Sequence, residues 1–170
     1  MSGTMTAATL VFAWGNPSRG DDALGPCFIE RLAALAADHP EWPNFEALTD
    51  FQLQIEHALD LAGRARILLV DACITCNPPF SVSAVAPARD ASISTHYLSA
   101  QALLQVYLDL TGSPPPPTQL LAIRGERFEL GEALSGAAAT HLDAALAWAA
   151  RWLVPGAYAS ARIDPCRFGA

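Results

Sequence analysis

The sequence predicts an α/β protein, a three-layer α/β/α sandwich in which helices cover both faces of a mostly parallel, twisted, five-stranded sheet. Three observations lead to this prediction. The chain has 170 residues, of which 52% are hydrophobic, so one domain can bury a sizeable core. Strand and helix patterns alternate along the chain, which is typical of parallel sheets with helical crossovers. Five short runs have strand character, enough for the whole sheet.

The predicted strands are short and are bounded by turn or polar residues. The strongest buried-strand signal is the apolar run ARILLV, which leads directly into Asp71. In chain order the predicted strands cover residues 9–14, 45–48, 65–70, 81–86 and 119–123.

Four segments carry apolar residues at helical spacing, as Phe28, Ile29 and Leu32 do in the first of them. The helices are expected over residues 21–37, 52–62, 98–110 and 135–153, with right-handed crossovers between strands. One domain is expected over residues 1–155, followed by an irregular tail over residues 156–170.

Composition excludes several classes of partner. The net charge is −7 with only ten Lys and Arg, which argues against nucleic acid and anionic membranes, whereas a basic peptide is compatible with it. No window approaches the roughly 18 apolar residues of a membrane helix, and the N-terminus lacks a signal-peptide pattern. Four cysteines are too sparse for a disulfide scaffold. We therefore expect a cytoplasmic protein, with a monomer preferred.

A glycine-bearing block, AWGNPSRGDDALG at residues 13–25, follows the first predicted strand. It does not match the dinucleotide fingerprint, because Pro17 stands where the second glycine is needed, and it has no Walker lysine. Two carboxylates, Asp21 and Asp22, begin the next helix and would repel a pyrophosphate. A nucleotide-binding module is therefore disfavoured.

The chemistry-bearing residues follow strands or precede helices. Asp21 and Asp22 follow the first strand, Asp71 follows the third, and His96 precedes a helix. Because ligands of parallel sheets bind beyond the carboxyl ends of the strands, these side chains are expected at one rim. Carboxylate and imidazole ligands together accept Ni, Zn, Fe or Mn.

Each residue also has a simpler interpretation that the sequence leaves open. Asp21 or Asp22 would serve as a helix cap, worth about 1 kcal/mol. Asp71 would be an ordinary residue of a strand-end turn, and His96 a solvated loop residue.

The block GNPSRGDDALG, the strand ILLVDA, the tripeptide STH at 94–96 and GERFELGEALS at 125–135 resemble the hydrogenase maturation endopeptidases. The resemblance runs from about residue 8 to residue 153. It implies a twisted sheet between helices and places the family's three metal-contacting residues on Asp22, Asp71 and His96. Asp21 becomes the helix-start carboxylate that supports the loop.

The resemblance implies a function as well. The family removes the C-terminal extension from the large-subunit precursor of [NiFe] hydrogenases once nickel has been inserted. The nickel belongs to the substrate, so we expect the isolated protein to carry no metal. The water-activating group stays open, with Asp22, Asp71 and the metal as candidates. The alternative is a non-catalytic, metal-binding escort of the immature subunit.

The segment DFQLQIEHALDL at 50–61 departs from the glycine-rich D-G-G-T turn of many family members. It is closer to the Q-L-x-x-E version found with soluble, NAD-reducing or bidirectional hydrogenases. Gln52 and Glu56 are candidates for an altered contact with the partner.

Two further motifs have no place in the family pattern. Cys73-x-x-Cys76 is typical of a redox pair or half of a zinc site, or is simply one buried thiol and one loop thiol. Asp164-Pro165-Cys166 repeats the first residues of the motif at which the family cleaves, and we interpret it as coincidence.

Overall fold

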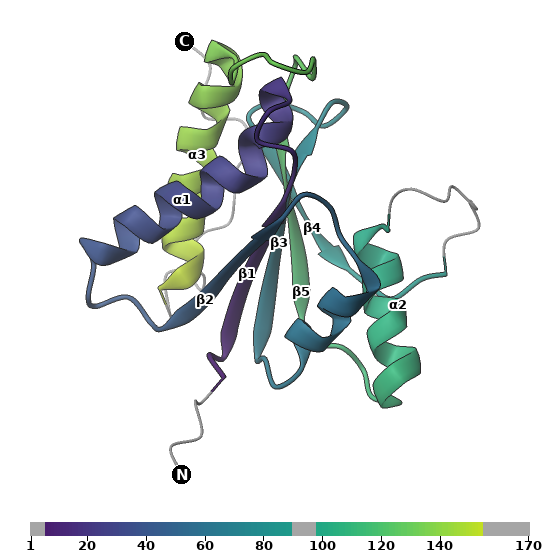
Figure 1. The fold of residues 1–170 in the computed structure, drawn as a ribbon. Coiled ribbons are helices and arrows are strands. Elements are labelled where there is room, and N and C mark those ends of the chain that lie inside the picture. Colours follow the sequence, from purple (N-terminus) through teal and green to yellow (C-terminus); the bar gives the residue numbers. More distant parts are fainter. Residues whose placement is uncertain (1–5, 90–97, 155–170) are drawn as a thin grey trace.

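A computed structural model describes residues 6–89 and 98–154, and it confirms the predicted α/β architecture. The elements, with η marking a 3₁₀ helix, are β1 (Thr9–Trp14), η1 (Gly20–Ala23), α1 (Leu24–Ala37), β2 (Phe45–Asp50), η2 (Ile55–Leu61), β3 (Arg66–Cys73), β4 (Phe80–Val85), α2 (Ala100–Thr111), β5 (Thr118–Arg124) and α3 (Gly136–Leu153). In Figure 1, α1 and α3 cover one face of the sheet, and η2 and α2 cover the other.

The strand order is β2-β1-β3-β5-β4, with β3 at the centre. Neighbouring strands are parallel except β4, which pairs antiparallel with β5. Only residues 74–79 connect β3 to β4. Since a parallel return needs a crossover of about a dozen residues or more, this short connection forces β4 to run the opposite way.

The core has two halves, one on each face of the sheet. Along β3, Leu68 and Val70 pack with α1 and α3, whereas Ile67 and Leu69 pack with η2 and α2. All four are 0% exposed, as expected for a parallel strand that is covered on both faces. Side chains alternate along a strand, so Asp71 continues the η2/α2 face.

Three strands are longer than predicted. The strand β2 ends on Asp50 rather than at residue 48, and β5 reaches Arg124. The central strand does not stop at residue 70, because its last three residues, beginning with Asp71, pair with the end of β5. Asp71 therefore lies inside the strand rather than in a turn after it.

Two helix predictions need correction. The helix expected over residues 21–37 is split into the 3₁₀ turn η1, which holds both aspartates, and α1. The helix expected over residues 52–62 is the 3₁₀ helix η2, in which the buried residues Ala58 and Leu61 are three apart and so fit three residues per turn. Within the described residues, no helix has the length and apolar character to cross a membrane.

Candidate active site

Asp71 lies near the carboxyl end of the central strand, and the indole of Trp14 on β1 donates a hydrogen bond to its carboxylate. Burial raises the pKa of Asp71 from its ordinary 3.8 to about 7, and the negative charge of Asp22 contributes to the rise. The hydrogen bonds from Trp14 and from the Ala72 N–H, 2.8 Å from Oδ1, offset only part of the effect of burial. Asp71 therefore titrates near neutral pH.

Asp22 lies in η1, just beyond the carboxyl end of β1. Its Oδ2 accepts a hydrogen bond from the Asn16 N–H at 2.8 Å, which fixes the carboxylate within the glycine block. Because the charge of Asp22 acts on Asp71, the two carboxylates share one end of the sheet, as predicted. Asp71 is in β3 and Asp22 is in the turn that follows the neighbouring strand β1, so the sheet brings together residues that are 49 positions apart.

His96 lies outside the described residues. Among residues 6–89 and 98–154, no group of three or more His, Cys, Asp or Glu side chains is placed to hold a metal ion. The meeting of His96 with Asp22 and Asp71 thus stays a prediction.

Asp21 has a different role from its neighbour in the sequence. It is 0% exposed, and its Oδ2 accepts hydrogen bonds from the N–H groups of Glu126 (2.7 Å) and Arg127 (3.0 Å). Ser135 donates twice, from its N–H to Oδ1 (2.7 Å) and from its hydroxyl to Oδ2 (2.8 Å). Burial acts to raise the pKa of Asp21, but these hydrogen bonds outweigh it and hold the pKa below its ordinary value.

Asp21 therefore ties the glycine block to the loop between β5 and α3. The capping interpretation is wrong for both aspartates, because neither η1 nor α1 has a side-chain cap hydrogen bond. The resemblance implies that Asp21 supports the glycine loop, and these hydrogen bonds provide such support by joining that loop to residues 126–135. The acceptor role of Asp21 could not be read from the sequence, since its partners are mostly backbone N–H groups more than 100 positions away.

Two glycines make this close approach of the loops possible. Gly20 has φ +53°, and a Cβ there would lie 2.4 Å from the carbonyl oxygen of Arg127. Gly15 has φ +147°, and its Cβ would lie 2.0 Å from the carbonyl oxygen of Asp22. Only glycine fits both the backbone conformation and the space. The glycine block thus positions its carboxylates.

A cavity of about 360 Å³ opens beside Asp71. It lies on the η2/α2 face, between the carboxyl ends of β1 and β3 and the start of α2. Its lining is mixed, with apolar side chains around Asp71 and two glutamines. The lining residues are Trp14, Gln52, Leu53, Asp71, Leu98, Ser99, Ala100, Gln101 and Leu120. The Asp71 carboxylate thus borders an open cavity.

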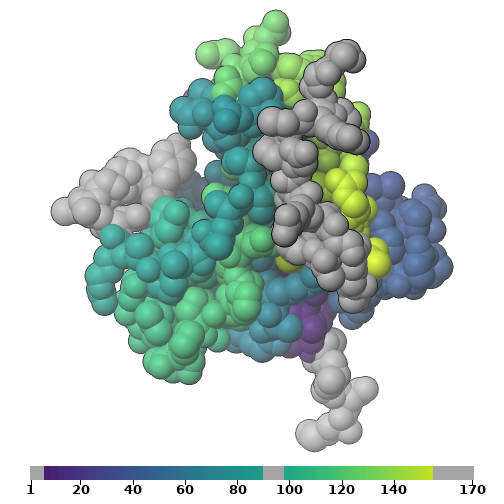
Figure 2. All heavy atoms as spheres, turned by 180° about the vertical axis from the view of Figure 1, so that it is seen from behind, coloured from purple at the N-terminus to yellow at the C-terminus, as the bar shows by residue number. Residues whose placement is uncertain are grey.

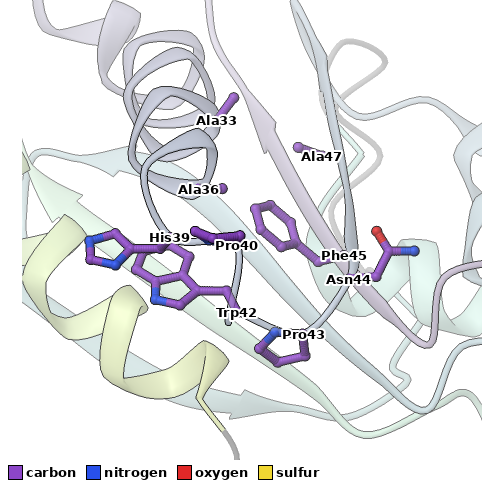
Figure 3. A pocket seen from close by; sticks show the side chains of 9 residues that line it. All are labelled: Ala33, Ala36, His39, Pro40, Trp42, Pro43, Asn44, Phe45 and Ala47. Atoms are coloured by element: carbon purple, nitrogen blue, oxygen red, sulfur yellow. The ribbon is translucent and has the colours of Figure 1, made fainter.

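A larger hollow, of about 470 Å³, lies at the opposite end of the parallel strands (Figure 3). It is formed between the end of α1 and the beginning of β2, where the His39 ring stacks on Trp42 at 4.8 Å. Phe45 begins β2, so this hollow faces the amino ends of the parallel strands. Because no carboxylate lines this hollow, we assign the functional site to the cavity beside Asp71.

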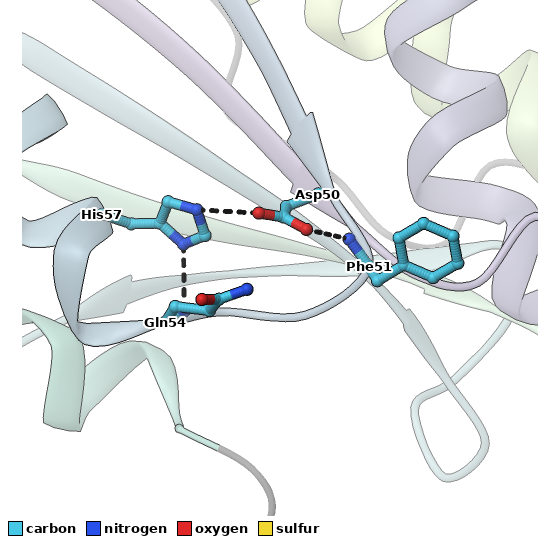
Figure 4. A network of polar contacts seen from close by, with 4 residues as sticks. All are labelled: Asp50, Phe51, Gln54 and His57. Atoms are coloured by element: carbon cyan, nitrogen blue, oxygen red, sulfur yellow. Dashed lines mark hydrogen bonds and ion pairs between the residues drawn. The ribbon is translucent and has the colours of Figure 1, made fainter.

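Asp50, the last residue of β2, makes a polar network with His57 and Gln54 (Figure 4). The Gln54 N–H donates to His57 Nδ1 at 2.9 Å, so the ring proton is on Nε2 and donates to Asp50 at 3.1 Å. The ring also packs on Phe12, with 4.6 Å between the ring centroids. Both ring nitrogens are occupied, so His57 is a packing residue rather than a metal ligand.

Replacing Asp71 with asparagine is expected to stabilise the protein above pH 7. Because the folded-state pKa is raised above 3.8, the folded protein keeps a proton that the unfolded chain releases between about pH 4 and pH 7. The contribution of Asp71 to stability therefore falls as pH rises through this window. A rise of this size in the pKa corresponds to at most about 4 kcal/mol, and partial solvent access reduces this to about 1–3 kcal/mol.

Urea unfolding at pH 5 and pH 8, in the presence of EDTA, measures this effect. The Asp71→Asn variant should exceed wild type in unfolding free energy at pH 8, with a smaller difference at pH 5. The matched control is Asp109→Asn, which removes an exposed carboxylate on α2 that does not line the cavity beside Asp71. An equal difference at both pH values for Asp71→Asn would contradict the raised pKa.

The fold is that of a three-layer α/β protein. Its candidate site consists of two interacting carboxylates, Asp22 and Asp71, beyond or at the carboxyl ends of the adjacent parallel strands β1 and β3. Comparisons with known proteins place this fold. No protein-family model matches the sequence, and a search of curated proteins gives no match either. Solved structures do match.

The [NiFe] hydrogenase maturation protease HycI from Thermococcus kodakarensis KOD1 superposes with a TM-score of 0.66 at 21% identity, over 86% of this chain and 93% of that one. For the hydrogenase maturating endopeptidase HybD from E. coli the TM-score is 0.64 at 23% identity, over 83% and 88%. HybD from T. kodakarensis gives 0.63 at 18% identity, over 86% and 99%.

Over about 85% of its length, this chain thus has the fold of the [NiFe] hydrogenase maturation proteases. The predicted resemblance is confirmed at the level of structure. The soluble-hydrogenase subtype is not resolved by it and stays a prediction.

Proposed function

We propose that this protein is an endopeptidase that removes the C-terminal extension of a [NiFe] hydrogenase large-subunit precursor after nickel insertion. Asp22, Asp71 and His96 would contact the nickel that the substrate carries. The observation that carries the proposal is the electrostatic interaction of Asp22 with Asp71 at the open end of a sheet with the maturation-protease fold.

The donor set supports a role in binding a divalent metal. Two carboxylates and one imidazole suit nickel and leave positions for groups that the substrate supplies. Asp21 is saturated by four hydrogen bonds from the protein and is unavailable for this role. Asp22, by contrast, accepts the Asn16 N–H at one oxygen and keeps acceptor capacity for a cation. These contacts support Asp22, and not Asp21, as the ligand of the pair.

In the protein without a metal ion the pKa of Asp71 is about 7, so this carboxylate exchanges a proton near neutral pH. A general base is most effective when its pKa lies near the working pH. Asp71 also borders the cavity in which the scissile peptide would lie. We therefore favour Asp71 over Asp22 as the group that takes a proton from the attacking water.

Binding through the substrate's own metal explains selectivity. The two carboxylates repel each other in the absence of a cation, so the site gains affinity for a precursor mainly when nickel is present. Metal-free precursor lacks this attraction and would bind too weakly to be cleaved. Gln52, which lines the cavity, and the exposed Glu56 are placed to contact the partner next to the peptide.

The decisive experiment follows the mass of the precursor. Purified protein is incubated with nickel-loaded and nickel-free large-subunit precursor in the cytoplasmic pH range, and the C-terminus is analysed by mass spectrometry. We expect the extension to be lost from the nickel-loaded form alone. Binding without any change in mass would favour the escort, and cleavage of both forms alike would refute recognition through nickel.

A further inference from the structure

The proposed function makes no use of Cys73-x-x-Cys76, which lies immediately beyond the candidate active site. Cys73 is the last residue of β3, and Cys76 lies in the connection to β4. Figure 2 shows this connection at the surface, at the top of the molecule beside the loop that precedes α3. Both thiols are partly exposed, and Ile74 between them is 59% exposed. The segment is therefore accessible to a small molecule.

The turn after β3 brings Cys73 and Cys76 close together. The Cys76 N–H donates to Cys73 Sγ at 2.9 Å, and the Cys76 thiol also makes a hydrogen bond with the sulfur of Cys73. The Cys76 thiol lies 3.8 Å from the Cys73 carbonyl oxygen and 3.6 Å from that of Ala122. Each cysteine thus lies within hydrogen-bond reach of the other, an arrangement from which a disulfide can close.

Neighbouring groups add to this arrangement. The Arg124 guanidinium donates to the Cys76 carbonyl at 2.9 Å, so a positive charge lies next to the pair. The Thr75 hydroxyl lies 3.9 Å from Cys73 Sγ and is a second polar neighbour of that sulfur. Donors and positive charge around a sulfur favour its reaction as a thiolate. By contrast, Cys27 packs against the core on α1.

We propose that Cys73 and Cys76 form a reversible dithiol–disulfide centre that exchanges with a low-molecular-weight disulfide of the glutathione class. Cys73, which accepts the hydrogen bonds, is the attacking sulfur, and Cys76 is the resolving one. This centre is independent of peptide cleavage.

The exchange proceeds in two balanced steps. The Cys73 thiolate attacks one sulfur of oxidised glutathione, breaks its S–S bond and releases one glutathione thiolate. Cys76 then attacks the Cys73 sulfur of the mixed disulfide and releases the second glutathione, and the two protons given up by the Cys73 and Cys76 thiols pass to the two released thiolates. The protein loses two electrons and two thiol hydrogens, and one glutathione disulfide becomes two glutathione thiols.

The cysteine pair lies next to the candidate active site. Cys73 and Asp71 are two residues apart on β3, so they lie on the same face of the strand. The Cys73 carbonyl accepts the N–H of Gly125, whose Cα is close to Asp21.

Intact-mass spectrometry of the native full-length chain tests the proposal. After incubation with excess oxidised glutathione, we expect the loss of two hydrogen masses and a peptide map that links Cys73 to Cys76, with full reversal by excess reduced glutathione. The Cys27→Ser and Cys166→Ser variants should behave like wild type, and Cys76→Ser should stop at a stable glutathione adduct on Cys73.

Three results would overturn the proposal. These are a persistent glutathione adduct on the wild-type chain, a cross-link to Cys27 or Cys166, and oxidation that occurs only after denaturation. The wild-type readout does not depend on whether a variant folds. It also requires no precursor, so failure here would leave the proposed cleavage untouched, and failure of cleavage would leave this centre standing.

Discussion

Asparagine in place of Asp71 is expected to slow the removal of the precursor extension by about a thousandfold or more while leaving the fold intact. The change keeps the size of the side chain, and the amide oxygen can still accept the Ala72 N–H. What it removes is the negative charge and the proton-accepting group, and losses of this kind cost about 10²–10⁴ in rate for each role. The proposed function gives Asp71 both roles.

Asp22→Asn and His96→Ala are expected to act in the same direction, mainly by weakening the binding of nickel-loaded precursor. The rate of extension loss, followed by mass spectrometry over time, measures all three variants. The matched control is again Asp109→Asn, which removes an exposed carboxylate that pairs with Arg89 far from this edge. Processing at the wild-type rate by the Asp22 and Asp71 variants would remove the basis of the proposed function.

Replacing Asp21 with alanine should have the largest effect on stability, with a loss of about 3–5 kcal/mol of unfolding free energy. The change leaves three backbone N–H groups and the Ser135 hydroxyl without their acceptor in a place that is 0% exposed. Each buried donor without a partner costs about 1–3 kcal/mol, and relaxation of the loop recovers part of the sum. Since native domains have only about 5–15 kcal/mol in total, partial unfolding at 37 °C is expected.

Urea denaturation followed by circular dichroism at pH 7.5 measures this loss. The matched control is the adjacent Asp22→Asn, which removes the same charge from the same turn but keeps an acceptor for the Asn16 N–H, and it should change stability by no more than about 1 kcal/mol. Ser135→Ala removes one of the four donors together with the cap of α3, so an intermediate loss is expected. Equal stability of the Asp21 and Asp22 variants would show that the loop contact contributes little.

Much of the fold could be predicted because local patterns report it. The apolar run before Asp71 is buried on both faces, and this made the central strand recognisable without its neighbours. Ser99, the residue before α2, caps the helix by accepting the Ala102 N–H at 3.1 Å, a contact between residues only three positions apart. The shared edge of Asp22 and Asp71 followed from the rule that the carboxyl ends of parallel strands lie together.

The sequence by itself determined the layers, the approximate strands and the acidic edge, because periodicity and strand polarity are local properties of the chain. Only the tertiary structure decided which of two adjacent aspartates is buried and which stays available, since the loop that saturates Asp21 comes from more than 100 positions away. It also decided that β4 runs antiparallel and that the Cys76 N–H donates to the sulfur of Cys73 at the end of β3. These outcomes depend on how distant segments meet. A backbone N–H donor is common to nearly all residue types, so the sequence does not show which residues will provide such hydrogen bonds.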